Sequence, residues 1–184
     1  MRGALAMLLA LLAPGCLWPE PVTEQRQTNN DQGPVIVKPN PNQEVIGTHL
    51  DGTHCRVTVG LNEVSSAATG GLTARFYLNY LDPTLGGPPI GNGHDVDYPL
   101  RLNQGVTGPI PIYTLDPIDL DLTPLVSSLF PENSTKSNLL YVFVSDQFAD
   151  PSFPVAAPGF AVVSTTWELD LTSSPSCDPH YFAP

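Results

Sequence analysis

The feature that most constrains the fold is an alternation of apolar and polar residues, which recurs in short segments along the chain. Near the C-terminal end, for example, Trp167, Leu169 and Leu171 alternate with Glu168 and Asp170. Successive side chains of a β-strand point to opposite faces of a sheet, so this pattern predicts strands with one buried face. The chain also contains 15 glycines and 21 prolines, which favour turns between short strands over helices.

The alternation and the turn residues together predict an all-β domain built as a two-sheet sandwich. A strand with one apolar face must bury that face, and two sheets packed face to face do this for each other. We expect seven or more strands. The segments that carry the pattern are Glu44–Leu50, Thr53–Gly60, Thr73–Leu81, Asp95–Leu102, Ile110–Tyr113, 118–122, Leu139–Ser145 and Phe160–Leu171, with 34–37 as a short strand that leads into the domain.

Two connections are predicted in more detail. Asp51-Gly52 stands between two alternating segments and indicates a two-residue hairpin turn. Residues Pro124–Phe130 have a proline at the first turn and another proline directly afterwards. We therefore predict one short helix at this point, crossing from one sheet to the other.

The first residues read as a targeting signal. Arg2 is followed by the apolar run Gly3–Ala13, which is much shorter than the roughly 20 residues that a membrane-spanning helix needs. The run leads into Ala13-Pro14-Gly15-Cys16, which resembles the lipobox of bacterial lipoproteins. The resemblance implies a signal peptide at 1–15 and a lipid-bearing Cys16. The residues up to 33 lack apolar periodicity and are rich in Gln, Asn and Pro, so we expect a lipidated N-terminus and flexible linker at 16–33 and the β-sandwich domain at 34–184. The alternative is cleavage by an ordinary signal peptidase, because Ala-x-Gly also fits that enzyme.

The chain has three cysteines, Cys16, Cys55 and Cys177. An oxidising compartment favours pairing of cysteines, so a lipid on Cys16 leaves Cys55 and Cys177 to form a disulfide. Cys55 begins the second strand of the alternating set and Cys177 follows the last one. Strands that alternate in direction place these two points at the same end of the sandwich, where a bond can form. Ordinary cleavage would instead leave one thiol without a partner.

The charge and the residue after Cys16 bear on partners and location. The formal net charge is -11, which disfavours nucleic acid and anionic lipid headgroups as partners. Leu17, rather than Asp, follows Cys16, which in Gram-negative lipoproteins of this kind implies sorting to the outer membrane, on its periplasmic or surface face. The expected partners are therefore the membrane, through the lipid, and a protein or glycan.

Two segments resemble strands of a known family. Residues Leu72–Asp82 (LTARFYLNYLD) and Leu140–Phe148 (LYVFVSDQF) are similar to the C and F strands of bacterial immunoglobulin-like domains of the PKD or cadherin-like type. The resemblance implies an immunoglobulin-like sandwich. It names no ligand. On the first of these segments we expect Phe76 and Tyr80 in the core, and Tyr77 exposed, where it can stack on a sugar or a partner side chain.

The sequence contains no G-x-S-x-G, H-E-x-x-H, P-loop or G-x-G-x-x-G motif. Its main group of candidate site residues is a set of aspartates, and carboxylates in loops between strands can bind Ca²⁺. The alternation of Asp119 and Asp121 with apolar residues is, however, that of the solvent face of a strand, and no D-x-D-x-D-G loop is present. We therefore assign no catalytic residue, no metal and no cofactor. The acidic residues are Asp95, Asp97, Asp116, Asp119 and Asp121.

Three functions remain open. The first is an outer-membrane-anchored lipoprotein that presents a non-catalytic immunoglobulin-like domain for binding, adhesion or envelope assembly. The second is a cation-dependent envelope enzyme, which requires Asp95, Asp97 and one of the three later acidic residues to converge. The third is a structural subunit of an envelope complex, which predicts an exposed apolar patch or an unpaired sheet edge.

Overall fold

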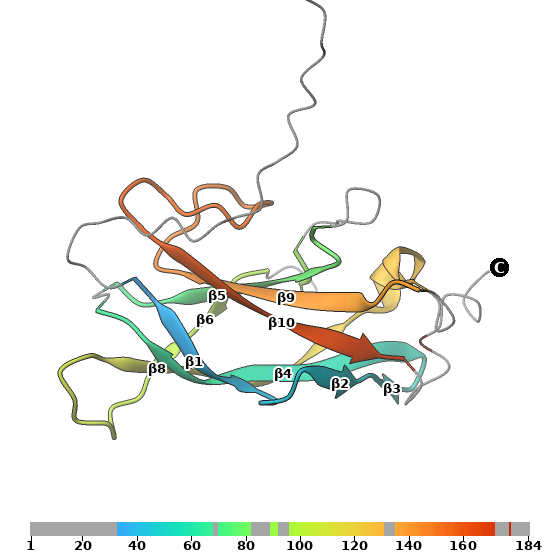
Figure 1. Cartoon of the computed structure of the whole chain (residues 1–184), viewed down its shortest axis with the longest axis horizontal. Helices are drawn as coiled ribbons and strands as arrows, with labels where there is room; N and C mark the ends of the chain where they lie inside the picture. Colours follow the sequence, from blue (N-terminus) through green and yellow to red (C-terminus); the bar gives the residue numbers. More distant parts are fainter. Residues whose placement is uncertain are drawn as a thin grey trace, which may run out of the picture.

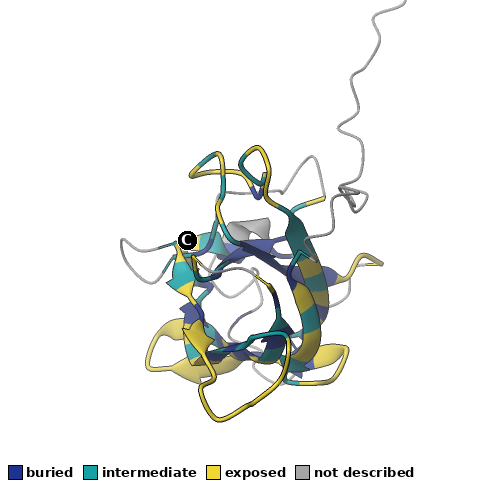
Figure 2. Cartoon of the chain, turned by 90° about the vertical axis from the view of Figure 1, so that its left-hand side faces the viewer, coloured by how far each residue is buried: buried dark blue, intermediate teal, exposed yellow. Residues whose placement is uncertain are grey.

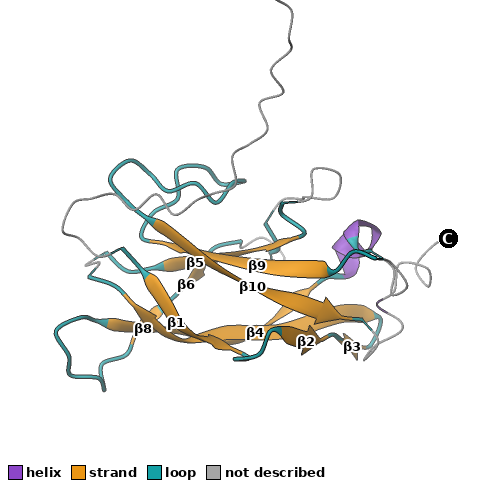
Figure 3. Cartoon of the chain, in the orientation of Figure 1, coloured by secondary structure: helices purple, strands orange, loops and turns teal. Residues whose placement is uncertain are grey.

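Two five-stranded sheets pack face to face in the computed structural model, which describes residues 33–67, 70–81, 89–91, 96–130, 135–171 and 177 (Figures 1 and 3). The predicted all-β two-sheet sandwich is confirmed. Sheet A has the order β1-β4-β8-β7, with β3 also paired to β4, and sheet B has the order β2-β10-β9-β5-β6. The strands are β1 (Val35–Asn40), β2 (Val45–Gly47), β3 (His49–Asp51), β4 (His54–Ser65), β5 (Thr73–Leu78), β6 (Tyr98–Pro99), β7 (Arg101–Leu102), β8 (Ile112–Asp121), β9 (Asn138–Ser145) and β10 (Val162–Asp170).

The period-two pattern places the core between the two sheets. In β4 the side chains of Cys55, Val57 and Val59 are completely buried, while Thr58 between them is exposed. Full burial of each aliphatic side chain stabilises the fold by roughly 1.5–3 kcal/mol. Trp167 is buried in β10, as predicted, and its indole N–H donates a 2.9 Å hydrogen bond to the carbonyl of Pro41. An end-on view shows buried residues between the sheets and exposed residues on the loops (Figure 2).

Two segments that were predicted as single strands are each divided between the sheets. Glu44–Leu50 contributes β2 to sheet B, where it runs parallel to β10, and β3 to sheet A. The change occurs at Thr48, whose N–H binds the carbonyl of Asp170. The segment predicted at Asp95–Leu102 divides in the same way, into β6 of sheet B and β7 of sheet A, and its first residue lies outside the described residues. The alternation of apolar and polar residues cannot reveal that a segment passes from one sheet to the other, because both halves of the segment keep an extended backbone.

The hairpin between β3 and β4 is shifted by one residue from the prediction. Asp51 pairs with His54, so the two loop residues are Gly52 and Thr53 rather than Asp51 and Gly52. Gly52 has φ 64°, a left-handed conformation that glycine adopts without steric cost. Glycine at the first loop position of a two-residue hairpin is the pattern of a type II′ turn.

Strand β8 joins two of the predicted segments, Ile110–Tyr113 and 118–122, into one long strand. It pairs with β4 along most of its length, and the register shifts between Val59 and Leu61. At this irregularity the backbones approach closely, since a Cβ added at Gly60 would lie 2.8 Å from the carbonyl oxygen of Leu115. After β8, the short 3₁₀ helix η1 (Thr123–Ser128) crosses to sheet B, as predicted for this segment.

The two ends of the sandwich carry different features. Cys55 and Cys177 form the predicted disulfide at the end where β4 begins, with a Cα–Cα distance of 5.3 Å. We call this end the disulfide pole. At the other end the chain enters β1: Val35 pairs with Ser65, and Ser145 pairs with Val162. We call this end the entry pole; it is on the left in Figure 1.

Candidate functional site

Two of the residues singled out from the sequence, Cys16 and Asp95, lie outside the described residues. The same holds for the predicted signal at 1–15 and for nearly all of the predicted linker, of which only Gly33 is described. In the portion of the chain that the structure describes, no helix has the length and apolar character needed to cross a membrane.

The four described aspartates of the acidic set bind four different side chains. Asp97 pairs with Arg75, and Asp116 lies 2.6 Å from Arg101. Asp119 accepts a hydrogen bond from Thr58, and Asp121 lies 2.9 Å from His54. Within the described ranges, no group of three or more His, Cys, Asp or Glu side chains is arranged to hold a metal ion. Each of these four aspartates therefore has a different side-chain partner within the domain.

Asp121 is bound by two residues, Thr123 and His54. Burial opposes its ionisation, but hydrogen bonds from the side chain and backbone of Thr123 and from His54 outweigh burial and lower its pKa. The contact with the backbone N–H of Thr123 is 2.9 Å long and holds the start of η1. The ring of His54 binds Asp121, while His49 on the other arm of the hairpin lies opposite Arg56. The arrangement stabilises the disulfide pole.

A second polar cluster centres on Arg75, a residue of β5 that the sequence did not single out as a candidate site residue. The side chain of Arg75 is 6 % exposed, although it projects from β5 on the face of sheet B that is turned away from the core. Its Nε and Nη2 bind the two carboxylate oxygens of Asp97, the second at 3.2 Å. Its Nη1 donates to the carbonyls of Asp150 and Phe153, and its guanidinium carbon lies 4.2 Å from the centroid of the Phe148 ring.

Arg75 is therefore a buried cation that binds one loop in three ways. Burial disfavours its charge, but the hydrogen bond and charge of Asp97 outweigh burial and raise the pKa of Arg75. A planar guanidinium can bind a carboxylate, two carbonyls and an aromatic face at once, whereas a lysine ammonium cannot. The sequence does contain a signal for this cluster, because an arginine in an otherwise apolar and aromatic strand requires polar partners if it is buried.

Aromatic rings pack beside Arg75 on the same outer face of sheet B. Tyr77 is completely buried there, so the expectation that it is exposed and can stack on a sugar or a partner is wrong. Its ring makes edge-to-face contacts with Tyr80 and Phe143, at centroid distances of 5.1 and 5.5 Å. Burial raises the pKa of Tyr77 to about 12. The expectation that Phe76 lies in the core is confirmed, but Tyr80, which was expected there too, packs partly buried in this outer cluster instead. The alternation does not extend to Tyr80, because β5 ends at Leu78 and Asn79 has φ 49°. Burial of the outer face was not predicted, because it involves Phe148, which is distant in the sequence and packs against these rings.

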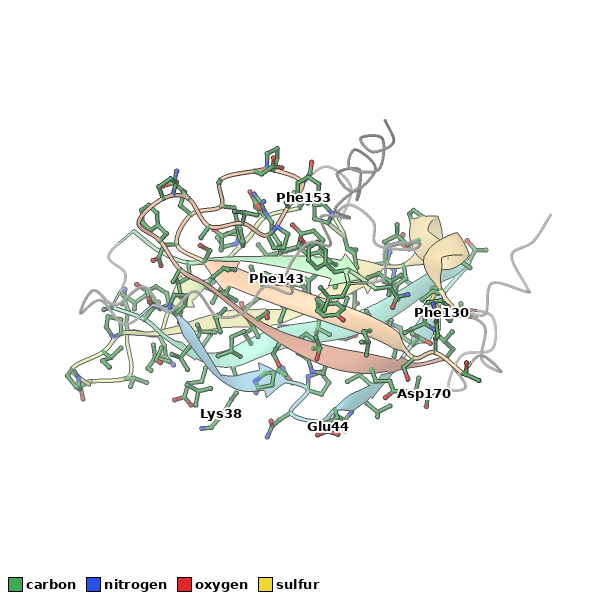
Figure 4. All side chains as sticks on the ribbon, turned by 45° about the horizontal axis from the view of Figure 1, so that its top comes forward. Lys38, Glu44, Phe130, Phe143, Phe153 and Asp170 are labelled. Atoms are coloured by element: carbon green, nitrogen blue, oxygen red, sulfur yellow. A yellow bond between two sulfur atoms is a disulfide. The ribbon has the colours of Figure 1, made fainter. Side chains whose placement is uncertain are left out.

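Phe148 belongs to loop 147–160, which connects β9 to β10. Its first part folds back on itself through hydrogen bonds from Ala149 N to the carbonyl of Val155, 2.7 Å, and from Ala157 N to the carbonyl of Gln147, 2.9 Å. Figure 4 shows Phe153 in this loop, over the face of β9 that carries Phe143. Together with Arg75, these bonds form a rigid loop whose outer side is left to solvent.

Comparison of the chain with models of protein families, with curated proteins and with solved structures found no match.

Proposed function

We propose that this chain is an exported bacterial lipoprotein whose sandwich is a non-catalytic module for binding, adhesion or envelope assembly. The observation that carries the proposal is the disulfide between Cys55 and Cys177. Disulfides form and persist in oxidising compartments, so the bond supports export from the cytoplasm. It also uses two of the three cysteines and leaves Cys16 alone, three positions after the end of the apolar run Gly3–Ala13.

The lipid on Cys16 gives the single remaining sulfur a role. Each buried CH₂ of an acyl chain contributes about 0.8 kcal/mol to membrane binding, and two or more chains hold a protein stably at the bilayer. Because Leu17 follows Cys16, we propose that the protein is retained at the outer membrane. The module would then be held close to the membrane by the linker 16–33.

The immunoglobulin-like assignment is part of this proposal and is supported by strand order. If β1, β4, β7 and β8 are labelled A, B, D and E, sheet A has the order A-B-E-D. With β5, β9 and β10 as C, F and G, sheet B contains G-F-C with β6 added beside C. This is the order of strands in immunoglobulin domains. The segments that resemble C and F strands correspond to β5 and β9, which pair with each other. One departure is that the disulfide lies at a pole rather than between strands B and F.

Non-catalytic binding is favoured over a cation-dependent enzyme by the contacts of the acidic residues. A hard cation such as Ca²⁺ takes six to eight oxygen ligands. The described aspartates instead bind Arg75, Arg101, Thr58 and His54. Their carboxylates are distributed among structural contacts.

The test is to express the full chain and its Cys16→Ala variant and to determine the N-terminal peptide and the membrane-bound fraction of each. We expect a diacylated or triacylated Cys16 as the first residue of the mature wild-type chain. The variant should be unprocessed and lack the lipid. A double variant, Cys55→Ala with Cys177→Ala, is the matched control, since it also removes thiols but should keep the lipid. An unmodified N-terminus that begins at Cys16, or equal processing of the Cys16→Ala variant, would show ordinary signal-peptidase cleavage and refute the proposal.

A further inference from the structure

Three large apolar side chains are exposed on loop 147–160. Phe153, Val155 and Phe160 are 55 %, 54 % and 41 % exposed, although two aromatic rings of this size would normally be buried. Between residues 147 and 160 the only charged side chain is Asp150, and its carboxylate accepts a 2.6 Å hydrogen bond from the backbone N–H of Ser152. The outer side of the loop is therefore apolar and has no exposed cation.

The loop is held in one conformation before anything binds to it. Arg75 binds the carbonyls of Asp150 and Phe153, which flank the tip of the loop. At its other end, the hydroxyl of Ser145 donates to the carbonyl of Ala161 at 2.8 Å. Such a loop loses little conformational entropy when its apolar side chains enter another apolar phase, which favours binding.

The position of the loop indicates which apolar phase is nearby. Gly33, at the entry to β1, is packed against the end of this loop, since a Cβ added at Gly33 would lie 2.7 Å from the Cβ of Ala161. Cys16 is 17 positions upstream of Gly33. A flexible segment of that length has a root-mean-square reach of roughly 20–25 Å. A lipid on Cys16 would therefore hold the entry pole, and loop 147–160 with it, next to the membrane surface.

We propose that loop 147–160 inserts Phe153, Val155 and Phe160 into the interfacial region of the lipid bilayer and orients the module with the loop-covered outer face of sheet B toward the membrane. This inference rests on the proposed lipid anchor. The net charge of -11 disfavours anionic headgroups, so the lipid surface that fits is zwitterionic. Sheet A, on the other side of the sandwich, is then directed away from the membrane and is available to a partner.

The experiment uses the full-length, processed protein bound to phosphatidylcholine vesicles, with and without bromine on the acyl chains. All variants carry Trp18→Phe, because Trp18 lies in the linker, and they keep the buried Trp167. Phe153→Trp and, separately, Phe160→Trp report on the loop. Leu50→Trp is the matched control, since Leu50 is as exposed as Phe160, at 41 %, but pairs with Cys55 at the disulfide pole. We expect a blue-shifted emission and at least twofold stronger quenching for both loop variants than for the control.

The loop proposal and the anchor proposal fail through different readouts. Quenching of both loop variants at the level of Leu50→Trp would overturn the loop proposal, whatever the state of Cys16. The mass of the N-terminal peptide from the same preparations tests the anchor. An unmodified peptide with strong quenching of Phe153→Trp would refute the anchor and still support insertion of the loop.

Discussion

The guanidinium carbon of Arg75 lies 4.2 Å from the centroid of the Phe148 ring, although the two residues are more than seventy positions apart in the chain. This contact attaches loop 147–160 to the outer face of β5. It explains why residues on both faces of β5 are buried, and it places the exposed Phe153 at the surface in a defined conformation. The sandwich therefore has a third layer over part of sheet B.

Substitution of Arg75 by alanine should destabilise the protein substantially. The change removes the buried partner of Asp97 and leaves two loop carbonyls without their donor. Because the Asp97 side chain is 53 % exposed and can be hydrated, we expect a loss near the low end for a broken buried pair, about 3 kcal/mol. Arg101→Ala is the matched control: Arg101 is 79 % exposed in its pair with Asp116, and its loss should cost less than about 0.5 kcal/mol. Urea unfolding of both variants measures the difference, and equal midpoints would contradict the role of Arg75.

Loss of the disulfide should lower the free energy of unfolding by several kcal/mol. Cys55 and Cys177 are separated by 122 positions, and the loss of chain entropy for a loop of that length corresponds to about 5 kcal/mol, with 2–5 kcal/mol usual for native disulfides. The double variant Cys55→Ala with Cys177→Ala should therefore unfold at a clearly lower denaturant concentration than the oxidised wild type. Reduction of the wild type should have a similar effect. An unchanged midpoint after complete reduction would show that the bond contributes nothing.

Asp121→Asn should lower stability at neutral pH and have no effect in acid. The pKa of Asp121 is lowered in the folded protein, so the ionised carboxylate stabilises the fold above the ordinary value of 3.8. That contribution is lost as the pH falls through the lowered pKa. Unfolding curves of the variant and the wild type should therefore differ at pH 7 and converge as the pH falls below 3.8 and through the lowered pKa of Asp121. A constant difference at all pH values would assign the effect to lost packing.

Asp146→Asn should have the opposite effect. Burial raises the pKa of Asp146, and its Oδ1 is buried without a hydrogen-bond partner among the described residues. Ionisation in the folded state is therefore unfavourable, and this carboxylate reduces stability above the ordinary pKa of 3.8. The neutral amide should raise the unfolding midpoint at pH 7 and make no difference once the carboxyl is protonated in both states. A destabilised variant at pH 7 would show that the charge is compensated.

Gly52→Ala tests the observed register of the first hairpin. Because Gly52 has φ 64°, an alanine there should cost about 1–2 kcal/mol. Gly70→Ala is the control, since a Cβ at either glycine meets no atom within 4 Å, but Gly70 does not have a positive φ. Its substitution should be neutral or slightly stabilising. Equal effects of the two substitutions would indicate that the turn is not built on Gly52.

Much of the β architecture could be predicted because it depends on local patterns. Alternation in β4 and β10 identified the buried side chains, and the near-continuous apolar run of β9 identified a strand in the interior of its sheet. The burial of Tyr77 could not be predicted, because it depends on a loop that begins seventy residues later. The division of Glu44–Leu50 between the sheets at Thr48 was missed for the same reason: the backbone remains extended, and only the partner strands differ.

By itself, the sequence determined which residues of the alternating strands face the core, and therefore that two sheets must cover each other. It also determined that Cys55 and Cys177 are available to pair. Side-chain alternation and the number of cysteines are properties of the chain alone. Only the tertiary structure decided that Arg75 holds loop 147–160 against sheet B, that the acidic residues bind separate partners, and that Gly33 packs against Ala161. The physical reason is that these contacts join segments distant in the chain, and their partners are specified by the packing of the two sheets rather than by any local preference.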